Sequence, residues 1–486
     1  MLSIILGIVG CFGNPATGDH FSGDSKIDTV ILNSIDTTVS RQVQVNRILI
    51  IGNKVTKDRI ISRELSLKQG DTISTTRLAQ VLARDKNKIY NLRLFNTVTV
   101  RVLGLTASQI DILVEVTERW YTFPSPIFEL SDRNFNEWYQ NYNHDFSRVN
   151  YGMRLLQQNF RGRNETLRLT AQFGFMRKFE LNYQIPYIDR KQKRGLVFTF
   201  DYGEPKNLAY YTRDHKLVYL RLPQVLKRTY GAGITYSYRK SFYETHSISV
   251  GYRSQSIADT VALLTDETKV NYYKNGATRQ QSLGIAYSLN SDHRDVIQYP
   301  LKGYQYTGSI SYYGLGSSTV NLFDLNVTQA RHWDLKRKYY LSNFTSVYFS
   351  NPTAQPYALY NALGHRKQLV RGYEIYVIEG PRFFLNKTTF KKRIFSQAWR
   401  WEDMPLEQFR HIPLAIYVKS YVDWGYVQNY PLYKQLDINT KLSDHLLAGV
   451  GAGVDVVSLY DLVFRFEYTV TREGTRGFFF NVKKEF

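Results

Sequence analysis

The stretch Leu196-Val197-Phe198-Thr199-Phe200-Asp201-Tyr202 alternates between two sets of side chains. Large apolar residues occupy the even positions, and Thr199 and Asp201 lie between them. Successive side chains of a β-strand point to opposite faces of a sheet, so the stretch predicts a strand with one apolar and one more polar face. The same alternation returns in many places from about residue 149 onward. The sequence therefore predicts an all-β region built from many similar strands.

The length of this region bounds the number of strands. Residues 149–486 would hold roughly sixteen strands of ~9–11 residues with their connections, which suits a closed transmembrane antiparallel barrel. Closure would also remove the exposed edges of so large a sheet. Alternation alone does not separate such a barrel from a soluble sandwich. The expected strands begin near residues 149, 165, 179, 195, 213, 230, 244, 280, 304, 320, 337, 382, 412, 444, 461 and 476.

Composition supports a membrane barrel. Only the extreme N-terminus is continuously apolar, which excludes a bundle of membrane helices, because each helix would need ~20 apolar residues in succession. Aromatic residues make up 15% of the chain and include 38 Tyr. Membrane barrels place aromatic girdles at both interfaces, although tyrosine-rich soluble sandwiches also exist. The aromatic content therefore favours a barrel without proving it.

The formal charge of +21 raises the question of a nucleic-acid partner. The basic residues are spread among turns and accompany no RNA- or DNA-binding motif, so anionic lipid headgroups or an acidic partner are expected, and no nucleic acid. A single cysteine allows neither a disulfide framework nor a thiolate metal site. Histidines such as His293 do not recur at metal-ligand spacing. No catalytic motif or cofactor-binding loop is found, so an enzyme is not predicted.

Residues 1–19 have the apolar core of a signal peptide. Cys11 follows Ile8-Val9-Gly10, and this arrangement resembles a bacterial lipobox, whose cysteine is lipidated. The usual basic n-region is missing. Two interpretations stay open, namely a lipidated Cys11 and an ordinary signal peptide with a chance cysteine. Residues 20–42 are polar and rich in Gly, Ser, Asp and Thr, which predicts a flexible linker.

Residues 43–120 are predicted to form an α+β domain in the order strand, helix, helix, strand, strand. Leu78, Leu82 and Ile89 follow helical spacing and should form the buried face of the second helix. The alternating Val98, Val100 and Val102 predict a strand at the edge of the domain. A second linker is expected at residues 121–148, before the barrel at 149–486.

One connection of the barrel is too long for a simple hairpin. Residues 351–380 are expected to form a long functional loop, and the loop contains Leu369-Val370-Arg371-Gly372-Tyr373. The guanidinium of Arg371 needs a carboxylate, and Asp423 supplies one in the later strand Tyr421-Val422-Asp423-Trp424-Gly425. Gly372 allows a tight backbone turn beside the arginine.

This pair of motifs resembles the BamA/TamA superfamily of outer-membrane insertases and related transporters. In that family an Arg-Gly-Tyr/Phe loop folds into the barrel and meets a barrel-wall aspartate, so the resemblance implies the same roles for Arg371 and for Asp423 with Gly425. The first domain resembles a POTRA module through Ile50-Ile51-Gly52-Asn53, Gly70-Asp71 and Leu94-Phe95-Asn96. Further matches are Asn159-Phe160-Arg161-Gly162, which resembles the first barrel hairpin, and a family turn with Asp292, Arg294, Asp295, Pro300 and Gly303.

The chain terminus is expected to close the barrel. Phe478, Phe480, Val482 and Phe486 share one face of the last strand, which resembles the β-signal read by the assembly machinery. The strand containing Gly152 and Met153 is expected to be the first of the barrel and to form the seam with this last strand. The resemblance covers residues 43–486.

The resemblance implies a bacterial outer-membrane protein with its POTRA domain in the periplasm. The expected function is non-enzymatic outer-membrane protein assembly or protein translocation, by strand capture at the POTRA domain and lateral opening of the seam. Outer-membrane lipids, unfolded client proteins and periplasmic accessory proteins would be the partners. Two alternatives stay open, a secretion transporter dedicated to one partner protein and a passive pore or structural barrel without insertase activity.

Overall fold

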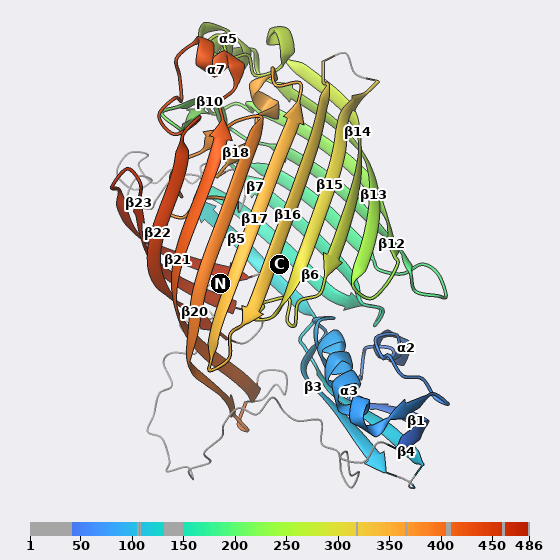
Figure 1. Ribbon diagram of the computed structural model, residues 1–486. Helices are drawn as coiled ribbons and strands as arrows, with labels where there is room; N and C mark the ends of the chain where they lie inside the picture. Colours follow the sequence, from blue (N-terminus) through green and yellow to red (C-terminus); the bar gives the residue numbers. More distant parts are fainter. Residues whose placement is uncertain are drawn as a thin grey trace.

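The computed structural model describes residues 41–104, 106, 108–130, 149–316, 319–364, 368–404, 410–458 and 462–484. A small α+β domain lies beneath one end of a large curved β-sheet (Figure 1). We call this end of the sheet the domain end and the opposite end the far end. The predictions for the signal peptide, for Cys11 and for Phe486 fall outside the described residues.

The first domain packs two helices on a four-stranded sheet. Leu78, Leu82 and Ile89 are fully buried on one face of the longer helix, as their helical spacing predicts. They pack against the buried face of the sheet, to which Val98, Val100 and Val102 contribute. The strand order is β2-β1-β4-β3, so β3 is an outer strand, as predicted. The elements are β1 (Gln42–Ile51), α2 (Asp58–Ser62), β2 (Thr72–Ser74), α3 (Thr75–Tyr90), β3 (Phe95–Gly104) and β4 (Gln109–Glu118).

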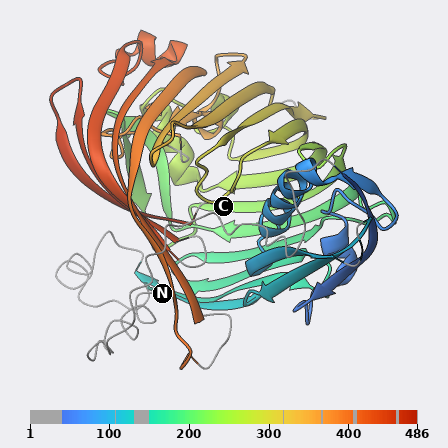
Figure 2. The ribbon, with the colours of Figure 1, turned by 60° about the horizontal axis from the view of Figure 1, so that its bottom comes forward.

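The large sheet contains sixteen antiparallel strands, and Figure 2 shows it curling around a central lumen. The strands of the sheet follow one another in space in the same order as along the chain, from β5 at one edge to β24 at the other. Its strands are β5 (Thr122–Leu130), β6 (Val149–Phe160), β7 (Glu165–Gly174), β8 (Arg177–Ile185), β9 (Arg194–Glu204), β12 (Lys227–Arg239), β13 (Glu244–Ile257), β14 (Arg279–Asp292), β15 (Gly303–Leu315), β16 (Leu322–Asp334), β17 (Tyr339–Asn351), β20 (Arg382–Arg400), β21 (His411–Gln428), β22 (Leu446–Val457), β23 (Leu462–Thr471) and β24 (Arg476–Lys484).

The predicted strand count is right, but two of its assignments are wrong and cancel. Residues 122–130 were assigned to a linker, whereas they form β5 and pair with β6. The strand expected near residue 213 lies outside the large sheet, in the hairpin of β10 (Asn207–Arg213) and β11 (Lys216–Arg221). The hairpin was taken for a barrel strand because both show the same alternation. Strand β5 was missed because its two prolines argue against a strand, although an edge strand tolerates proline.

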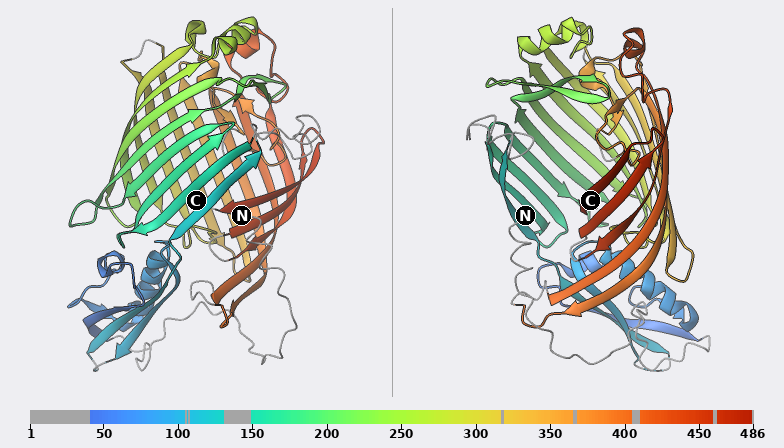
Figure 3. Two further views of the ribbon diagram at one scale, coloured as in Figure 1. Left: turned by 180° about the vertical axis from the view of Figure 1, so that it is seen from behind. Right: turned by 90° about the vertical axis from the view of Figure 1, so that its left-hand side faces the viewer.

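The position of β5 also corrects the predicted seam. Strand β6, which contains Gly152 and Met153, pairs with β5 on one side and with β7 on the other, so it is an interior strand. The outer strands of the sheet are β5 and β24. Within the described residues, no hydrogen-bonded ladder joins these two strands (Figure 3, right).

Alternation divides the sheet into an outer and an inner face. On β21, Val418, Val422 and Trp424 are exposed on the outside, whereas Tyr421 and Asp423 are buried on the inside. The same outward exposure of large apolar side chains recurs on most strands, including β9, β13 and β24. No helix in the described ranges is long and apolar enough to cross a membrane.

The far end carries a tyrosine-rich cap. Its buried side chains include Tyr357, Tyr360, Tyr430 and Tyr433. The rings of Tyr360 and Tyr430 stack with their centroids 3.8 Å apart. The cap is built by the β10 and β11 hairpin and by α5 (Asp259–Glu267), η2 (Lys274–Gly276), η3 (Tyr357–Leu359), β18 (Ala362–Leu363), β19 (Ile378–Glu379) and α7 (Pro431–Gln435).

Candidate functional site in the barrel lumen

The connection between β17 and β20 folds back into the barrel, as predicted for residues 351–380. We call residues 352–381 the lumen loop. Its base is a short antiparallel ladder in which Ala362 pairs with Glu379 and Leu363 with Ile378. Its tip carries the predicted motif, and Val370 and Tyr373 are buried against the inner barrel wall. The loop therefore has two attachments, one at the tip and one at the base.

Arg371 at the tip forms a two-point ion pair with Asp423 of β21. Its Nη2 lies 2.5 Å from Oδ1 of the carboxylate and its Nε 2.7 Å from Oδ2. The backbone N–H of Arg371 also donates to Oδ2 at 3.1 Å. Asp423 has no exposed surface and Arg371 exposes only 7%. Because both partners are buried, removing either one would leave an uncompensated buried charge, which costs far more than breaking a surface ion pair.

Other strands complete the arginine site. Nη1 of Arg371 lies 3.3 Å from a carboxylate oxygen of Glu467 on β23, and Nη2 donates to the Thr389 hydroxyl at 3.0 Å. The guanidinium also sits 3.6 Å from the ring centroid of Tyr421, close enough for a cation–π contact. The anchor therefore does not rest on Asp423 alone, because Glu467 and Thr389 also bind the guanidinium.

Glycines let the loop approach the wall this closely. Gly372 has φ +97°, a left-handed conformation that glycine adopts without strain. A Cβ at Gly449 on β22 would lie 2.1 Å from the carbonyl oxygen of Arg371, and one at Gly425 would lie 3.0 Å from Val370. The predicted Gly425 therefore borders the loop, whereas the tighter contact, at Gly449, was not predicted.

A second group of charges continues the network toward the domain end. Glu467 accepts from the ammonium of Lys419 at 2.7 Å, and Lys419 contacts Asp455 at 2.5 Å. The hydroxyl of Tyr299 donates to Asp455 at 2.8 Å. All four side chains are buried. A continuous set of ion pairs and hydrogen bonds thus runs from the loop tip to Tyr299.

Tyr299 lies in the turn between β14 and β15 that contains the predicted motif residues. Arg294 forms a two-point ion pair with Asp292, with distances of 2.8 and 2.6 Å. The Asp295 carboxylate accepts from the backbone N–H groups of Val296 and Leu301, which closes the turn. Gly303 has φ +106°, and a Cβ there would lie 2.2 Å from a backbone oxygen. The motif residues therefore shape the turn that places Tyr299 in the lumen.

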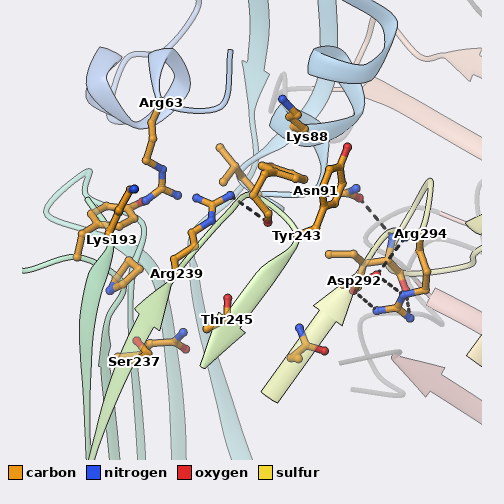
Figure 4. Close-up of a pocket in the computed structure, with 17 residues that line it drawn as sticks. Arg63, Lys88, Asn91, Lys193, Ser237, Arg239, Tyr243, Thr245, Asp292 and Arg294 are labelled. Atoms are coloured by element: carbon orange, nitrogen blue, oxygen red, sulfur yellow. Dashed lines mark hydrogen bonds and ion pairs between the residues drawn. The ribbon is translucent and has the colours of Figure 1, made fainter. Parts of the chain in front are cut away.

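The same turn touches the first domain. The side chain of Asn91, at the end of α3, donates to the Asp295 carbonyl at 3.1 Å and accepts from the Ile297 N–H at 3.3 Å. A cavity of about 300 Å³ lies at this junction. Figure 4 shows Arg63 and Lys88 of the first domain facing Arg239, Tyr243 and Arg294 of the barrel.

Glu64 ties the domain to the barrel beside this cavity. Arg239 contacts both of its carboxylate oxygens, at 2.8 and 2.9 Å. Burial alone would raise the pKa of Glu64, but the hydrogen bonds and charges of Arg239 and Arg63 outweigh burial and lower it. Asn159 of the predicted first barrel hairpin adds a contact by donating to the Thr56 hydroxyl at 2.8 Å.

The base of the lumen loop is held differently. Glu379 accepts hydrogen bonds from the hydroxyls of Tyr433 and Thr212, at 2.7 and 3.0 Å. Burial raises the pKa of Glu379 to about 7, because these hydroxyl donors compensate only part of the cost of burying its charge. Sequence reasoning missed Glu379, because its contacts come from elements far apart in the chain.

These arrangements favour holding the loop in place over catalysis. Arg371, Asp423, Glu467, Lys419 and Asp455 pair with one another in the lumen, so removing any one of them would leave a buried charge uncompensated. The described part of the chain contains no group of three His, Cys, Asp or Glu side chains that could hold a metal ion. Glu467, Lys419 and Asp455 were not predicted as site residues, although each is a charged residue within an alternating strand pattern, and that pattern is the signal that could have found them.

The predicted residues of the POTRA edge and of the last strand lie outside this lumen site. Val98, Val100 and Val102 lie on the outer strand β3, but their side chains belong to the domain core. Phe478 and Phe480 are exposed on the outer face of β24. Val482 lies in the same strand, but its side chain is outside the described structure.

The fold and this site define a class: a sixteen-stranded barrel with an N-terminal α+β domain and a lumen loop held by ion pairs. The family model for POTRA, described as a surface antigen variable number repeat, matches residues 43–119, and the model for the Omp85 superfamily domain matches residues 159–486. The second match covers more than half of the chain. The chain therefore belongs to the Omp85 superfamily.

The chain is similar to several solved structures. BamA from Haemophilus ducreyi lacking POTRA domains 1–3 is 16% identical, with a TM-score of 0.49, and the match covers 90% of this chain and 83% of that chain. CdiB from Escherichia coli is 11% identical, with a TM-score of 0.51, and the match covers 90% and 75% of the two chains. CdiB from Acinetobacter baumannii is 13% identical, with a TM-score of 0.46 and coverage of 90% and 72%. No curated protein sequence matches the chain significantly.

Membership of the superfamily implies an outer-membrane barrel of bacteria with its POTRA domain in the periplasm. The domain end is then the periplasmic end, and the tyrosine-rich cap lies at the extracellular end. Proteins of this superfamily are in general non-enzymatic transporters or insertases.

Proposed function

We propose that this protein inserts other polypeptides into the outer membrane or moves them across it, without chemical catalysis. A client strand is captured at the free edge of the POTRA sheet and then engages the barrel seam, which opens laterally. The observation that carries this proposal is that no ladder joins β5 to β24 among the described residues. Two open edges in one sheet offer backbone donors and acceptors to an incoming strand.

The chemistry of β5 weakens its own seam edge. The N–H of Gln158 donates to the carbonyl of Tyr121, so residues 121 and 158 form a hydrogen-bonded pair of the ladder between β5 and β6. Hydrogen-bonded and non-bonded pairs alternate along an antiparallel ladder, so residues 122, 124, 126 and 128 point their backbone groups to the free edge. Two of these positions are Pro124 and Pro126, which have no N–H to donate. The seam edge of β5 therefore lacks two donors.

The POTRA domain offers a second free edge at β3. The N–H of Arg119 donates to the Leu94 carbonyl, which sets the phase of the ladder between β4 and β3. The register shifts by one residue between Phe95 and Thr97. Beyond this shift Thr97, Thr99 and Arg101 bond to β4, and the N–H groups of Val98, Val100 and Val102 point to the open edge. The predicted edge residues would thus bind a client through their backbone.

The lumen loop contributes a fixed inner wall. Arg371 links the loop to β21 and β23, two strands of the C-terminal part of the sheet that ends at the seam. We infer that this anchor is needed for activity. Release of the tip would leave Asp423 and Glu467 without the guanidinium, and these residues belong to the strands that lead to the seam.

Restoring the missing donors tests the role of the seam. Pro124→Val with Pro126→Val adds two N–H groups at the free edge, so the seam should close more tightly and client assembly in reconstituted vesicles should slow. Ser125→Val is the matched control, because residue 125 points its N–H toward β6. Equal assembly rates for the double variant and the control would contradict a role for this edge.

A disulfide tests seam opening directly. Phe128 on β5 and Phe478 and Phe480 on β24 are exposed on the outer face. In a Cys11→Ser background, cysteines at Phe128 and at either β24 position should lock the seam when oxidised. Client assembly should stop on oxidation and return on reduction. An oxidised, cross-linked protein that assembles clients at the rate of the reduced one would show that lateral opening is not the mechanism.

Strand capture is tested at Val100. Val100→Pro removes one N–H from the open edge of β3 while leaving the bonds to β4 in place, so client binding should fall. Circular dichroism of the variant must show a folded domain, because Val100 also belongs to the core. Undiminished client binding by the folded variant would count against edge capture.

A transporter dedicated to one partner protein is the second candidate. The POTRA domain that the structure describes offers β3 as its capture strand, and capture through one such strand favours a narrow range of clients. Depletion of the protein followed by a proteomic inventory of the outer membrane separates the candidates. Broad loss of barrels supports a general insertase and loss of one exported protein supports a dedicated transporter. No loss supports a passive pore or structural barrel.

A further inference from the structure

Strands β20 and β21 are longer than their neighbours. The ladder between β17 and β20 ends where Tyr339 pairs with Lys392, and the ladder between β21 and β22 ends where Ala415 pairs with Val457. Among the described residues, 393–400 of β20 therefore have no ladder partner besides β21, and 411–414 of β21 have none besides β20. We call these residues the hairpin extension. It projects from the periplasmic end of the barrel, at the lower end of β20 in Figure 1.

One face of the hairpin extension continues the lipid-facing wall. On β21 the even-numbered side chains point outward, as exposed Val418 and Val422 show. In the same alternation Ile412, Leu414 and Ile416 lie on the outer side. Their partners on β20 are Trp399, Gln397 and Phe395, respectively. The outer face of the extension is therefore mostly apolar.

A β-bulge places the aromatic residues on this face. Along β20 the even residues Phe390 and Lys392 point outward, but the register shifts between Arg393 and Phe395. The additional residue, Ile394, moves the odd-numbered side chains onto the outer face beyond it. Phe395 and Trp399 then stack there with ring centroids 5.9 Å apart, and both are exposed.

The extension begins where the membrane interface is expected. Phe390 stacks on Tyr339 of β17 with centroids 5.6 Å apart, and the ammonium of Lys392 lies 5.0 Å from the centroid of the same ring. Aromatic rings together with long cationic side chains are characteristic of the boundary between hydrocarbon and headgroups. The eight residues that follow would span ~26 Å as a strand, whereas one headgroup layer is only ~5–8 Å deep. A straight extension would hold Trp399 in water, and one that bends at the bulge and lies along the membrane would not.

We propose that the hairpin extension lies on the periplasmic leaflet and binds its phospholipid headgroup layer, with Phe395 and Trp399 turned into the leaflet. Continuity with the lipid-facing wall favours lipid over a client protein. Two features also disfavour addition of a client strand to the extension. Pro413 in β21 has no N–H, and the bulge in β20 interrupts the other edge. The extension would thus be a membrane-surface contact outside the barrel itself.

The test compares two adjacent residues on opposite faces. In a Cys11→Ser background, Gln397→Cys carries an environment-sensitive fluorophore on the outer face, and Ala398→Cys is the matched control on the other face. The full-length protein is reconstituted in vesicles of phosphatidylethanolamine and phosphatidylglycerol. A nitroxide near the lipid headgroup should quench the label at 397 several-fold more than the label at 398, and iodide in the buffer should show the reverse order. Trp399→Ser should release the label at 397 to iodide.

Two outcomes would overturn the proposal. Equal exposure of both labels to iodide, without quenching by the lipid nitroxide, would place the extension in water. Protection of the label at 397 only after an unfolded barrel client is added would identify a polypeptide as the partner. A label at Val422→Cys, on the lipid-facing wall, verifies that the nitroxide reaches the protein surface.

Discussion

The tip and the base of the lumen loop both bury a carboxylate, but they stabilise it in opposite ways. At the tip, Asp423 faces the guanidinium of Arg371 at 2.5 Å. At the base, Glu379 is hydrogen-bonded by the hydroxyls of Tyr433 and Thr212 within a cluster of tyrosines. Burial alone therefore does not decide how a carboxylate is held. At the tip the carboxylate faces a guanidinium, whereas at the base burial raises the pKa of Glu379 and the hydroxyl donors offset only part of that effect.

The difference predicts different weak points. The tip should fail when one charged partner is removed, because the remaining charge stays buried and unpaired. The base should fail gradually, because tyrosine packing remains when one hydrogen bond is lost and because its carboxylate responds to pH near neutrality.

Arg371→Ala should have the largest effect. It removes the two-point contact with Asp423 and the contact with Glu467, so the cost should reach ~3–5 kcal/mol for full burial, and less where lumen water reaches the carboxylates. Residues 368–377 should become accessible to protease, and client assembly should fall. Arg371→Lys should restore protection only partly, because an ammonium lacks the planar two-point geometry. A loop protected equally in wild type and Arg371→Ala would contradict this anchoring role.

Tyr433→Phe should have an intermediate effect at the base. The substitution keeps the ring and its packing but removes the hydroxyl that donates to Glu379, which should cost ~1–3 kcal/mol in unfolding measurements in detergent micelles. The tip should stay protected from protease. Release of the tip in this variant, to the same extent as in Arg371→Ala, would show that the two attachments are not separate.

Raising the pH should loosen the base by a smaller amount. A carboxyl whose folded pKa lies above its unfolded value adds stability at low pH, and this stability is lost as the pH rises through the folded pKa, about 7 for Glu379. From about pH 6.5 to about pH 8.5 the loss should be ~1 kcal/mol. Burial lowers the pKa of nearby His215 to about 4, so this histidine stays neutral across the window.

Hydrogen exchange of residues 376–380 reports the loosening of the base. Glu379→Gln is the control, because an amide does not titrate. In this variant the exchange protection of residues 376–380 should stay constant across the same pH window once the intrinsic pH dependence of exchange is subtracted. A wild-type protein with the same flat profile would contradict a titrating Glu379.

Lys387→Met should have the smallest effect. The ammonium of Lys387 donates to the Leu369 carbonyl at 3.1 Å and lies 3.7 Å from Asp423, which keeps its closer partner Arg371. The expected cost is ~1 kcal/mol, with protease protection of the tip largely retained. A loss as large as that of Arg371→Ala would mean that Lys387, and not Arg371, neutralises Asp423.

The sequence predicted the parts of this molecule that follow a short period or a local motif. Period-two alternation predicted fifteen of the sixteen sheet strands, and the spacing of Leu78, Leu82 and Ile89 predicted the buried helix face. The motif around Arg371 and the carboxylate Asp423 were also predicted, because an inward loop with a guanidinium requires an acid on the wall. Strand β5 was missed because Pro124 and Pro126 disfavour a strand everywhere except at an edge.

The rest depends on distances between strands that the sequence does not encode locally. Glu467 lies 96 positions after Arg371, and Glu379 meets a hydroxyl from Thr212, 167 positions earlier. Alternation shows that such a side chain faces inward, but it does not fix which inward side chains lie at the same height, because strand tilt and register decide that. The bulge at Ile394 changes the facing of every later residue in β20, and no local signal marks it.

The most direct test of the account is a double-mutant cycle on Arg371 and Asp423. Arg371→Ala, Asp423→Ala and the double variant are compared for protease protection of residues 368–377 and for client assembly in the same vesicles. The account predicts that the double variant loses less than the sum of the single losses, because an ion pair already broken cannot be broken again. Additive losses would contradict it, since they would show that Arg371 does not hold the loop through Asp423.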